Sequence, residues 1–171
     1  MYSLSDAVEL VEKLALESNI PIDPIFVANN LYIQKHKLFF KVKEYLNVSV
    51  NYDSDVDFIS CVFKNTTSNA YFITVNEKFD EIAQRFAIAH CVGHILLGHL
   101  EDGEVKTQKK FPIECDDQDG DASIVASHLL FPTSMVYSVI RIGRYDVNYM
   151  ARILDVSSTL VHFRLKEESY L

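Results

Sequence analysis

Two histidines, His90 and His94, stand four residues apart in the sequence. On an α-helix, side chains at this spacing project from the same face, so both imidazoles can reach one metal ion. The pattern is close to H-E-x-x-H, in which the Glu after the first His activates a metal-bound water for hydrolysis. Here that second position is Cys91. The segment is therefore predicted to hold a metal but to lack the residue that would use it for hydrolysis.

Cys91 allows three interpretations. Its thiol can face the metal in place of the Glu, where it is too short and of the wrong chemistry to orient a water molecule. It can be an additional metal ligand, because thiolates bind zinc strongly. It can also be an inert buried thiol, as free cysteines often are. General acid–base catalysis contributes roughly 10²–10⁴-fold, so loss of the Glu predicts very slow hydrolysis.

A tetrahedral zinc site needs a third protein ligand, which usually comes from a later helix when the first two come from an H-x-x-x-H pair. Asp119 is the first candidate, because it lies three residues before the apolar position Ala122 and shares its inward face. Asp121 is the alternative, and Glu114 is a weaker candidate because it falls in a predicted loop. Ser123 is placed to hydrogen-bond a ligand. Asp119 equally suits the role of a helix cap.

The histidines require a long helix to position them. Apolar residues surround them on nearly every side, which predicts a buried helix that begins at Asp80 or Glu81 and ends near Gly98. His99 is expected at the solvated end of this helix.

Other segments are predicted from their periodicity. The β-rich runs 56–63 and 70–75, joined by turn residues, predict a hairpin. The acidic segment 101–118 is predicted to be a loop, and 32–50 is not assigned to strand or helix. Further helices are predicted at 3–18, 25–31, 119–130, 134–143, 147–154 and from a Ser157 cap toward Leu165.

Composition and charge limit the function. A chain of 171 residues that is 49% hydrophobic can form one core and hence one domain. Its net charge is −8, and phosphate binding needs clustered Lys and Arg, so direct nucleic-acid binding is not expected. Residues 101–121 hold eight acids against three lysines, a net charge of −5.

The cysteines and the N-terminus bear on the compartment. Cys61, Cys91 and Cys115 form an odd number without close spacing, which favours a reducing compartment. Residues 1–6 lack the basic and apolar regions of a signal peptide, and no apolar run reaches membrane-spanning length. We expect a soluble cytoplasmic protein.

Five segments, in order along the chain, resemble motifs of the ImmA/IrrE family of bacterial and phage metallopeptidases. The central one, QRFAIAHCVGHILLGH, is similar to the family pattern qRFtiAHElGHlLLgH. The five segments are residues 20–28, 71–76, 84–99, 122–132 and 151–165.

The resemblance implies an α+β fold: a single zincin-like metallopeptidase domain over residues 1–171, with a small antiparallel sheet, a central metal-binding helix and a helical C-terminal part from about 133. It implies zinc ligands at His90, His94 and, with a Glu-to-Asp change, Asp119. The catalytic Glu of the family corresponds to Cys91, and an Asn of a later motif to Ser123. Asp is one methylene shorter than Glu and loses roughly 1.5 Å of reach, so zinc occupancy is left open at this point.

The resemblance also implies a partner, because the family cleaves or binds helix-turn-helix transcriptional repressors in mobile elements or stress responses. We expect a catalytically impaired pseudo-enzyme that binds a protein such as a repressor, without membrane association. One alternative is an active zinc peptidase with a base from elsewhere. Another is a DNA-binding regulator that uses the C-terminal helices, but residues 133–171 carry five basic against four acidic side chains, too balanced for a phosphate-tracking face.

Overall fold

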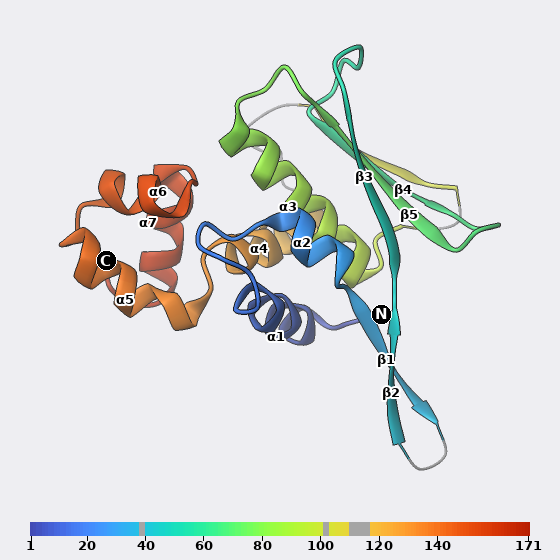
Figure 1. Cartoon of the computed structure of the whole chain (residues 1–171), viewed down its shortest axis with the longest axis horizontal. Coiled ribbons are helices and arrows are strands. Elements are labelled where there is room, and N and C mark those ends of the chain that lie inside the picture. Colours follow the sequence, from blue (N-terminus) through green and yellow to red (C-terminus); the bar gives the residue numbers. More distant parts are fainter. Residues whose placement is uncertain (38–39, 101–102, 110–116) are drawn as a thin grey trace.

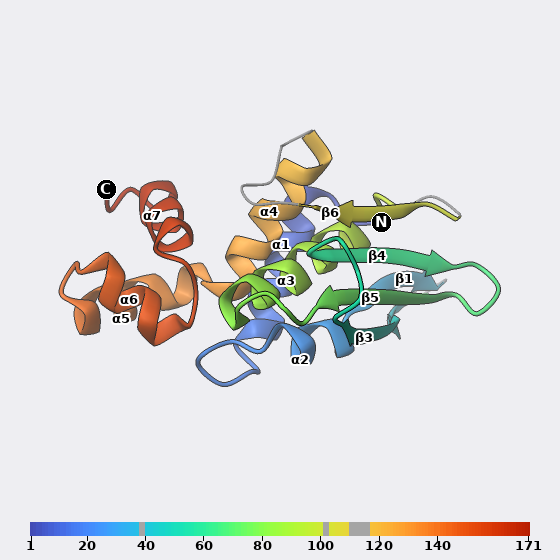
Figure 2. The same ribbon diagram turned by 90° about the horizontal axis from the view of Figure 1, so that it is seen from above.

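The computed structural model describes the backbone of residues 1–37, 40–100, 103–109 and 117–171, and the side chains of these residues outside 33–42. A sheet, a central group of helices and a helical C-terminal part follow one another across the molecule (Figures 1 and 2). In chain order the elements are α1 (Leu4–Ala15), α2 (Pro24–Asn29), β1 (Tyr32–Lys37), β2 (Phe40–Tyr45), β3 (Asn47–Asp53), β4 (Ser60–Asn65), β5 (Ala70–Asn76), α3 (Glu81–Leu97), β6 (Val105–Gln108), α4 (Asp117–Leu130), α5 (Thr133–Gly143), α6 (Val147–Leu154) and α7 (Ser158–Glu167). No single helix in the described part is long and apolar enough to cross a membrane; only α4 and α5 taken together, bent by 58°, match in length and composition.

The four-stranded sheet has the order β3-β5-β4-β6. β4 and β5 form the predicted antiparallel hairpin, and β6 pairs antiparallel with β4. β3, however, is parallel to β5, so the expectation of a wholly antiparallel sheet is wrong for this pair. Parallel neighbours need a crossover connection, and residues 54–69, which include β4, supply it.

The structure resolves two segments that the sequence treated differently. The unassigned segment 32–50 contains β1, β2 and β3, and β1 pairs with β2 as an antiparallel ribbon that extends away from the body (Figure 1). The loop expected at 101–118 is wrong in part, because residues 105–108 form β6. This short edge strand is held by pairing, including an Ile59 N–H that donates to the Gln108 carbonyl at 2.8 Å. Glu114 and Cys115 lie outside the described residues.

Helix α3 confirms its predicted bounds, and both ends have a chemical cause. The Asp80 carboxylate accepts from the Ala83 N–H at 2.9 Å, as an N-cap does. Gly98 ends the helix at φ 73°, in the left-handed region that glycine adopts without strain. Residues 87–96 are all buried, because α3 lies between the sheet and the helices α1, α2 and α4 (Figures 1 and 2).

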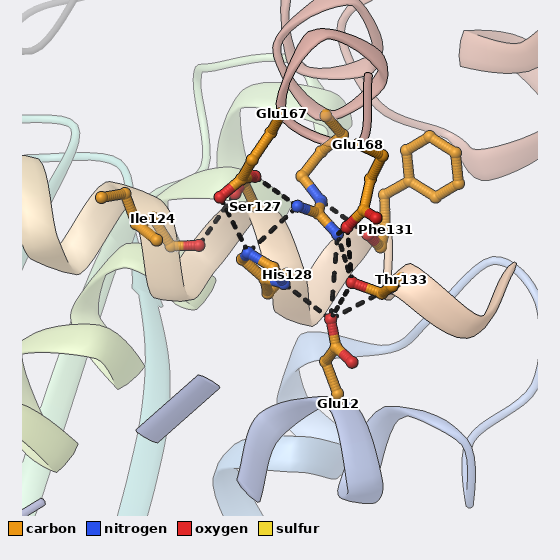
Figure 3. Close-up of polar contacts among 9 residues, drawn as sticks. Glu12, Ile124, Ser127, His128, Phe131, Thr133, Glu167 and Glu168 are labelled. Atoms are coloured by element: carbon orange, nitrogen blue, oxygen red, sulfur yellow. Dashed lines mark hydrogen bonds and ion pairs between the residues drawn. The ribbon is translucent and has the colours of Figure 1, made fainter. Parts of the chain in front are cut away.

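The predicted helical C-terminal part consists of α5, α6 and α7, which lie together at the end of the molecule away from the sheet (Figure 1). Arg164 of α7 ties this part to the body, and its side chain is fully buried. The guanidinium donates to the Phe131 carbonyl at 3.0 Å and to the Thr133 hydroxyl at 2.9 Å. It also contacts the carboxylates of Glu167 and Glu168 (Figure 3). A buried charge needs such partners, so this cluster fixes α7 against α4 and α5.

Glu12 of α1 joins the same cluster from the opposite side (Figure 3). Its Oε1 accepts from the Thr133 N–H at 3.0 Å and lies 2.6 Å from Nδ1 of His128, a residue to which the sequence assigned no role. Burial alone raises the pKa of Glu12, but the hydrogen bonds from His128 and Thr133 outweigh burial and lower the pKa to about 2. The ionised carboxylate therefore links α1 to α4 and to the start of α5.

The low pKa of Glu12 predicts a pH-dependent contribution to stability. Because the pKa falls from 4.5 to about 2 on folding, this contribution is complete above pH 4.5 and is lost as the pH falls toward 2. Glu12→Gln should lower the free energy of unfolding by about 1 kcal/mol at pH 7, a value discounted for partial exposure. Urea denaturation at pH 7, 4 and 3 should show the gap from the unmodified protein shrinking with acid. Glu9→Gln, an exposed carboxyl on the same helix, is the control, and a gap that stays constant with pH would contradict the assignment.

Candidate metal centre

The structure brings together the three side chains that the sequence proposed as metal ligands. His90 and His94 lie on one face of α3, with their Nε2 atoms 3.0 Å apart. Asp119, in the first turn of α4, places Oδ1 3.1 Å from His94 Nε2 and 3.7 Å from His90 Nε2. Both histidines are buried and Asp119 is partly exposed. Among the described residues these three form the one group of His, Cys, Asp and Glu with the spacing of a metal site.

These distances fit a tetrahedral zinc ion. Zinc bonds to nitrogen and oxygen are about 2.0–2.1 Å long, which places neighbouring ligand atoms of a tetrahedron about 3.3 Å apart. The observed separations of 3.0, 3.1 and 3.7 Å lie on both sides of that value. Three protein ligands with a fourth position left over is also the arrangement of catalytic zinc sites. The donor set therefore suits zinc, despite the shorter Asp119.

Asp119 reaches the histidines because α3 and α4 approach each other closely at Gly93. A Cβ built on Gly93 would lie 2.6 Å from the Ala122 carbonyl oxygen and 2.8 Å from the Ala122 Cα. No other residue type fits there unless the helices separate. Gly93 lies between the two histidines in sequence, and Ala122 lies one turn beyond Asp119. The close approach thus compensates for the methylene that Asp119 lacks relative to Glu.

The second nitrogen of each histidine also has a partner. Ser123 Oγ lies 3.3 Å from His90 Nδ1, in the role predicted for Ser123. His94 Nδ1 lies 3.1 Å from His99 Nδ1. His99 therefore belongs to the site, and its expected placement at a solvated helix end is wrong. Contacts of this kind fix ring orientation and leave Nε2 for the metal.

His99 was missed because its position after the helix hid its direction. The left-handed Gly98 turns the chain back, and the His99 N–H bonds to the His94 carbonyl at 3.0 Å. A Gly-His pair after the second histidine is the signal that could have revealed this contact.

Burial keeps the histidines in the form that binds metal. It is the main cause that lowers the pKa of His94 well below its usual range, His90 lowers it further, and Asp119 opposes both. The neutral imidazole is the form with a free lone pair for a metal. The alternative ligand Asp121 is not part of the group of three, and Glu114 lies outside the described residues.

Cys91 faces the sheet through a hydrogen bond instead of joining the ligand group. Its Sγ donates to Ser60 Oγ at 3.6 Å, and the residue is buried. Burial raises the pKa of Cys91 to about 12, with the Ser60 contact as a weaker opposing effect. A thiol this basic stays protonated at neutral pH, so it is neither a metal-binding thiolate nor a base. Of the three interpretations of Cys91, these contacts favour the inert buried thiol.

Ser60 and Gln108 extend this buried polar chain, and sequence analysis singled out neither of them. Ser60 Oγ lies 3.2 Å from Gln108 Oε1 across the β4–β6 pair. Gln108 Nε2 is a buried donor that has no hydrogen-bond partner in the described structure. Position 91 thus lies beside hydroxyl and amide groups, which a longer carboxylate side chain could use as hydrogen-bond donors.

The fold and the site together define a zincin-like metallopeptidase domain, in which a helix with two histidines lies beside a small sheet. Residues 43–166 match the peptidase M78 family, described as the IrrE N-terminal-like domain, and the chain belongs to this family. The match confirms the ImmA/IrrE resemblance and the α+β fold that it implied. No curated protein matches the chain.

The site predicts about one zinc per chain. His90→Ala and His94→Ala should each abolish binding, because two remaining ligands cannot hold the ion. His99→Ala should keep the stoichiometry but weaken affinity about 10–100-fold, since it removes an orienting contact. Elemental analysis of untagged protein, with a competing chelator to measure affinity, provides both values. His162→Ala, at an exposed position on α7, is the control; unchanged zinc content in the His90 and His94 variants would place the metal elsewhere.

Gly93→Ala tests the helix approach. The added methyl should push α4 away, so zinc affinity should fall roughly tenfold or more, as for other losses of ligand positioning, and a second change, Asp119→Glu, should recover part of it by restoring reach. Gly120→Ala is the matched control, because nothing lies within 4 Å of its added Cβ. Isothermal titration with zinc measures all four proteins. Wild-type affinity in Gly93→Ala would show that the close approach does not set the reach of Asp119.

Proposed function

We propose that the protein is a zinc-binding but catalytically impaired member of its family that acts by binding a protein partner in the cytoplasm. One observation supports this most directly: the three ligand side chains keep zinc-like spacing, while position 91 holds a protonated, buried thiol. The departure from the family pattern thus falls on the base and spares the fold and the ligand set.

The chemistry that remains follows from the residues present. When bound, zinc would polarise a substrate carbonyl and lower the pKa of a coordinated water. His90, His94 and Asp119 would hold the ion, and Ser123 and His99 would orient the two imidazoles. Cys91 cannot accept a proton at neutral pH while it remains a thiol hydrogen-bonded to Ser60. Loss of a general base slows hydrolysis by roughly 10²–10⁴-fold, which supports binding as the surviving activity.

Charge supports a basic partner. The sequence 101–121, which follows α3 and includes Asp119, has a net charge of −5. A basic surface, such as the DNA-binding region of a helix-turn-helix repressor, would be attracted to it and would associate faster at low salt. The same charge disfavours direct binding to DNA. A transcriptional repressor of a mobile element or stress response is therefore the partner class we propose.

The proposal is tested with the repressor encoded nearest to the gene. Calorimetry should show binding that weakens with added salt, and intact-mass spectrometry should show that the repressor remains uncut. Cys91→Glu combined with Asp119→Glu should introduce detectable cleavage, because it restores a base beside Ser60 and Gln108. Cleavage by the unmodified protein at an ordinary enzymatic rate, lost in His90→Ala, would show an active peptidase instead. Tight binding of duplex DNA by this chain alone would favour the regulator alternative.

A further inference from the structure

The C-terminal part carries exposed aromatic and basic side chains far from the metal centre. Tyr137 and Tyr145 are 61% and 64% exposed, and the neighbouring Ile142 is 59% exposed. Figure 1 shows α5 and α6, which bear these residues, at the end of the molecule away from the sheet. Exposed aromatic side chains that gather on one element pair call for an explanation in terms of contact. We call this the Tyr–Arg face and define it as Tyr137, Arg141, Arg144, Tyr145, Tyr149 and Arg152.

Pairs of side chains on this face are held by stacking. The Arg141 guanidinium lies 6.0 Å from the centre of the Tyr137 ring, and Arg152 lies 5.6 Å from that of Tyr149. The first pair is spaced i,i+4 and the second i,i+3, so each pair spans one helical turn. Cation–π contacts restrict these long side chains before any partner arrives, which reduces the entropy lost on binding.

The turn between α5 and α6 is strained at two residues of the face. Arg144 and Tyr145 have φ of 50° and 62°, in the left-handed region. This conformation costs about 1 kcal/mol or more for each residue that is not glycine. Flanking contacts hold it: the Asp146 carboxylate caps α6 through the Tyr149 N–H at 3.0 Å. Glycine would relieve the strain, yet the turn carries Arg and Tyr, two residue types enriched in binding hot spots.

The face is rigidly attached. The Arg164 cluster fixes α7 to Phe131 and Thr133, where α5 begins. Within the C-terminal part, Gly143 packs so closely on Met150 that an added Cβ would lie 2.2 Å from Met150 Cγ. A preorganised surface of this kind loses little freedom on association.

Charge decides the partner. Residues 133–152 contain three arginines and one aspartate, a net charge of +2, in a chain of net charge −8. We propose that the Tyr–Arg face docks a folded protein whose contact surface has Asp and Glu side chains around an apolar centre. The apolar centre would cover Ile142 and the tyrosine rings, and the acids would meet the arginines. The acidic remainder of the chain repels such a partner elsewhere and so orients it. A nucleic acid, by contrast, has no apolar centre and meets the net charge of −8.

Site-specific photo-crosslinking tests this in the organism that encodes the protein. A benzophenone amino acid replaces Tyr145 in one strain and Tyr45 in another. Tyr45 is the matched control, because it is 63% exposed and lies on β2, at the far side of the molecule (Figure 1). We expect a discrete protein adduct from position 145 alone. The adduct is identified by mass spectrometry, and the partner is then purified for calorimetry.

Binding of that partner should weaken roughly tenfold or more with Arg144→Glu or Tyr145→Ala, as at a hot spot. Lys78→Glu, which makes the same charge change at an exposed position before α3, should alter affinity less than about twofold. Equal crosslinking from positions 145 and 45, an adduct with nucleic acid or with a second copy of this chain, or affinity unchanged by Arg144→Glu would each overturn the proposal. The metal centre is untouched by these variants, so zinc binding and the repressor test are independent of the outcome.

Discussion

The geometry of the metal centre depends on the close approach of α3 and α4 at Gly93. The approach leaves no space for a side chain against Ala122, and it sets how far a ligand on α4 must reach. With a short Asp119 the three ligand atoms still have zinc-like separations. The core supports this arrangement, because α3 is buried on all sides along residues 87–96. A ligand change that looks damaging in sequence is thus accommodated by the helix spacing.

Position 91 shows the opposite case, in which one substitution alters chemistry without disturbing the fold. A thiol is small and apolar enough to be buried, and its hydrogen bond to Ser60 satisfies its weak donor. The same burial that makes Cys91 harmless to the core raises its pKa and removes it from acid–base chemistry. Ligands and base are therefore separable in this chain, which is the basis for proposing a protein that binds metal and partner without hydrolysis.

Much of this could be predicted from sequence because it rests on local patterns. The bounds of α3 follow from an Asp cap, a run of apolar residues and a terminal glycine, and His90 and His94 share a face by helical spacing alone. Asp119 was identified because it shares a helical face with Ala122. The identity of these residues was thus accessible, but the distances between them were not.

What could not be predicted depends on long-range pairing. The parallel placement of β3 beside β5 and the short edge strand β6 are set by strand pairing, and their sequences carry weak signals. His99 joins the site only because Gly98 reverses the chain. The Arg164 cluster joins four helices from distant parts of the sequence, and no spacing rule connects Glu12 to His128. The contact of Cys91 with Ser60 likewise required knowledge of which strand faces α3.

The central claim, a retained metal site from which Cys91 is withdrawn, is tested most directly by a zinc-soaked crystal with diffraction measured on both sides of the zinc absorption edge. The account predicts one anomalous peak at about 2.0–2.2 Å from His90 Nε2, His94 Nε2 and an Asp119 oxygen, with the Cys91 sulfur still hydrogen-bonded to Ser60. The absence of a peak at these residues, or a peak at about 2.3 Å from the Cys91 sulfur, would contradict it.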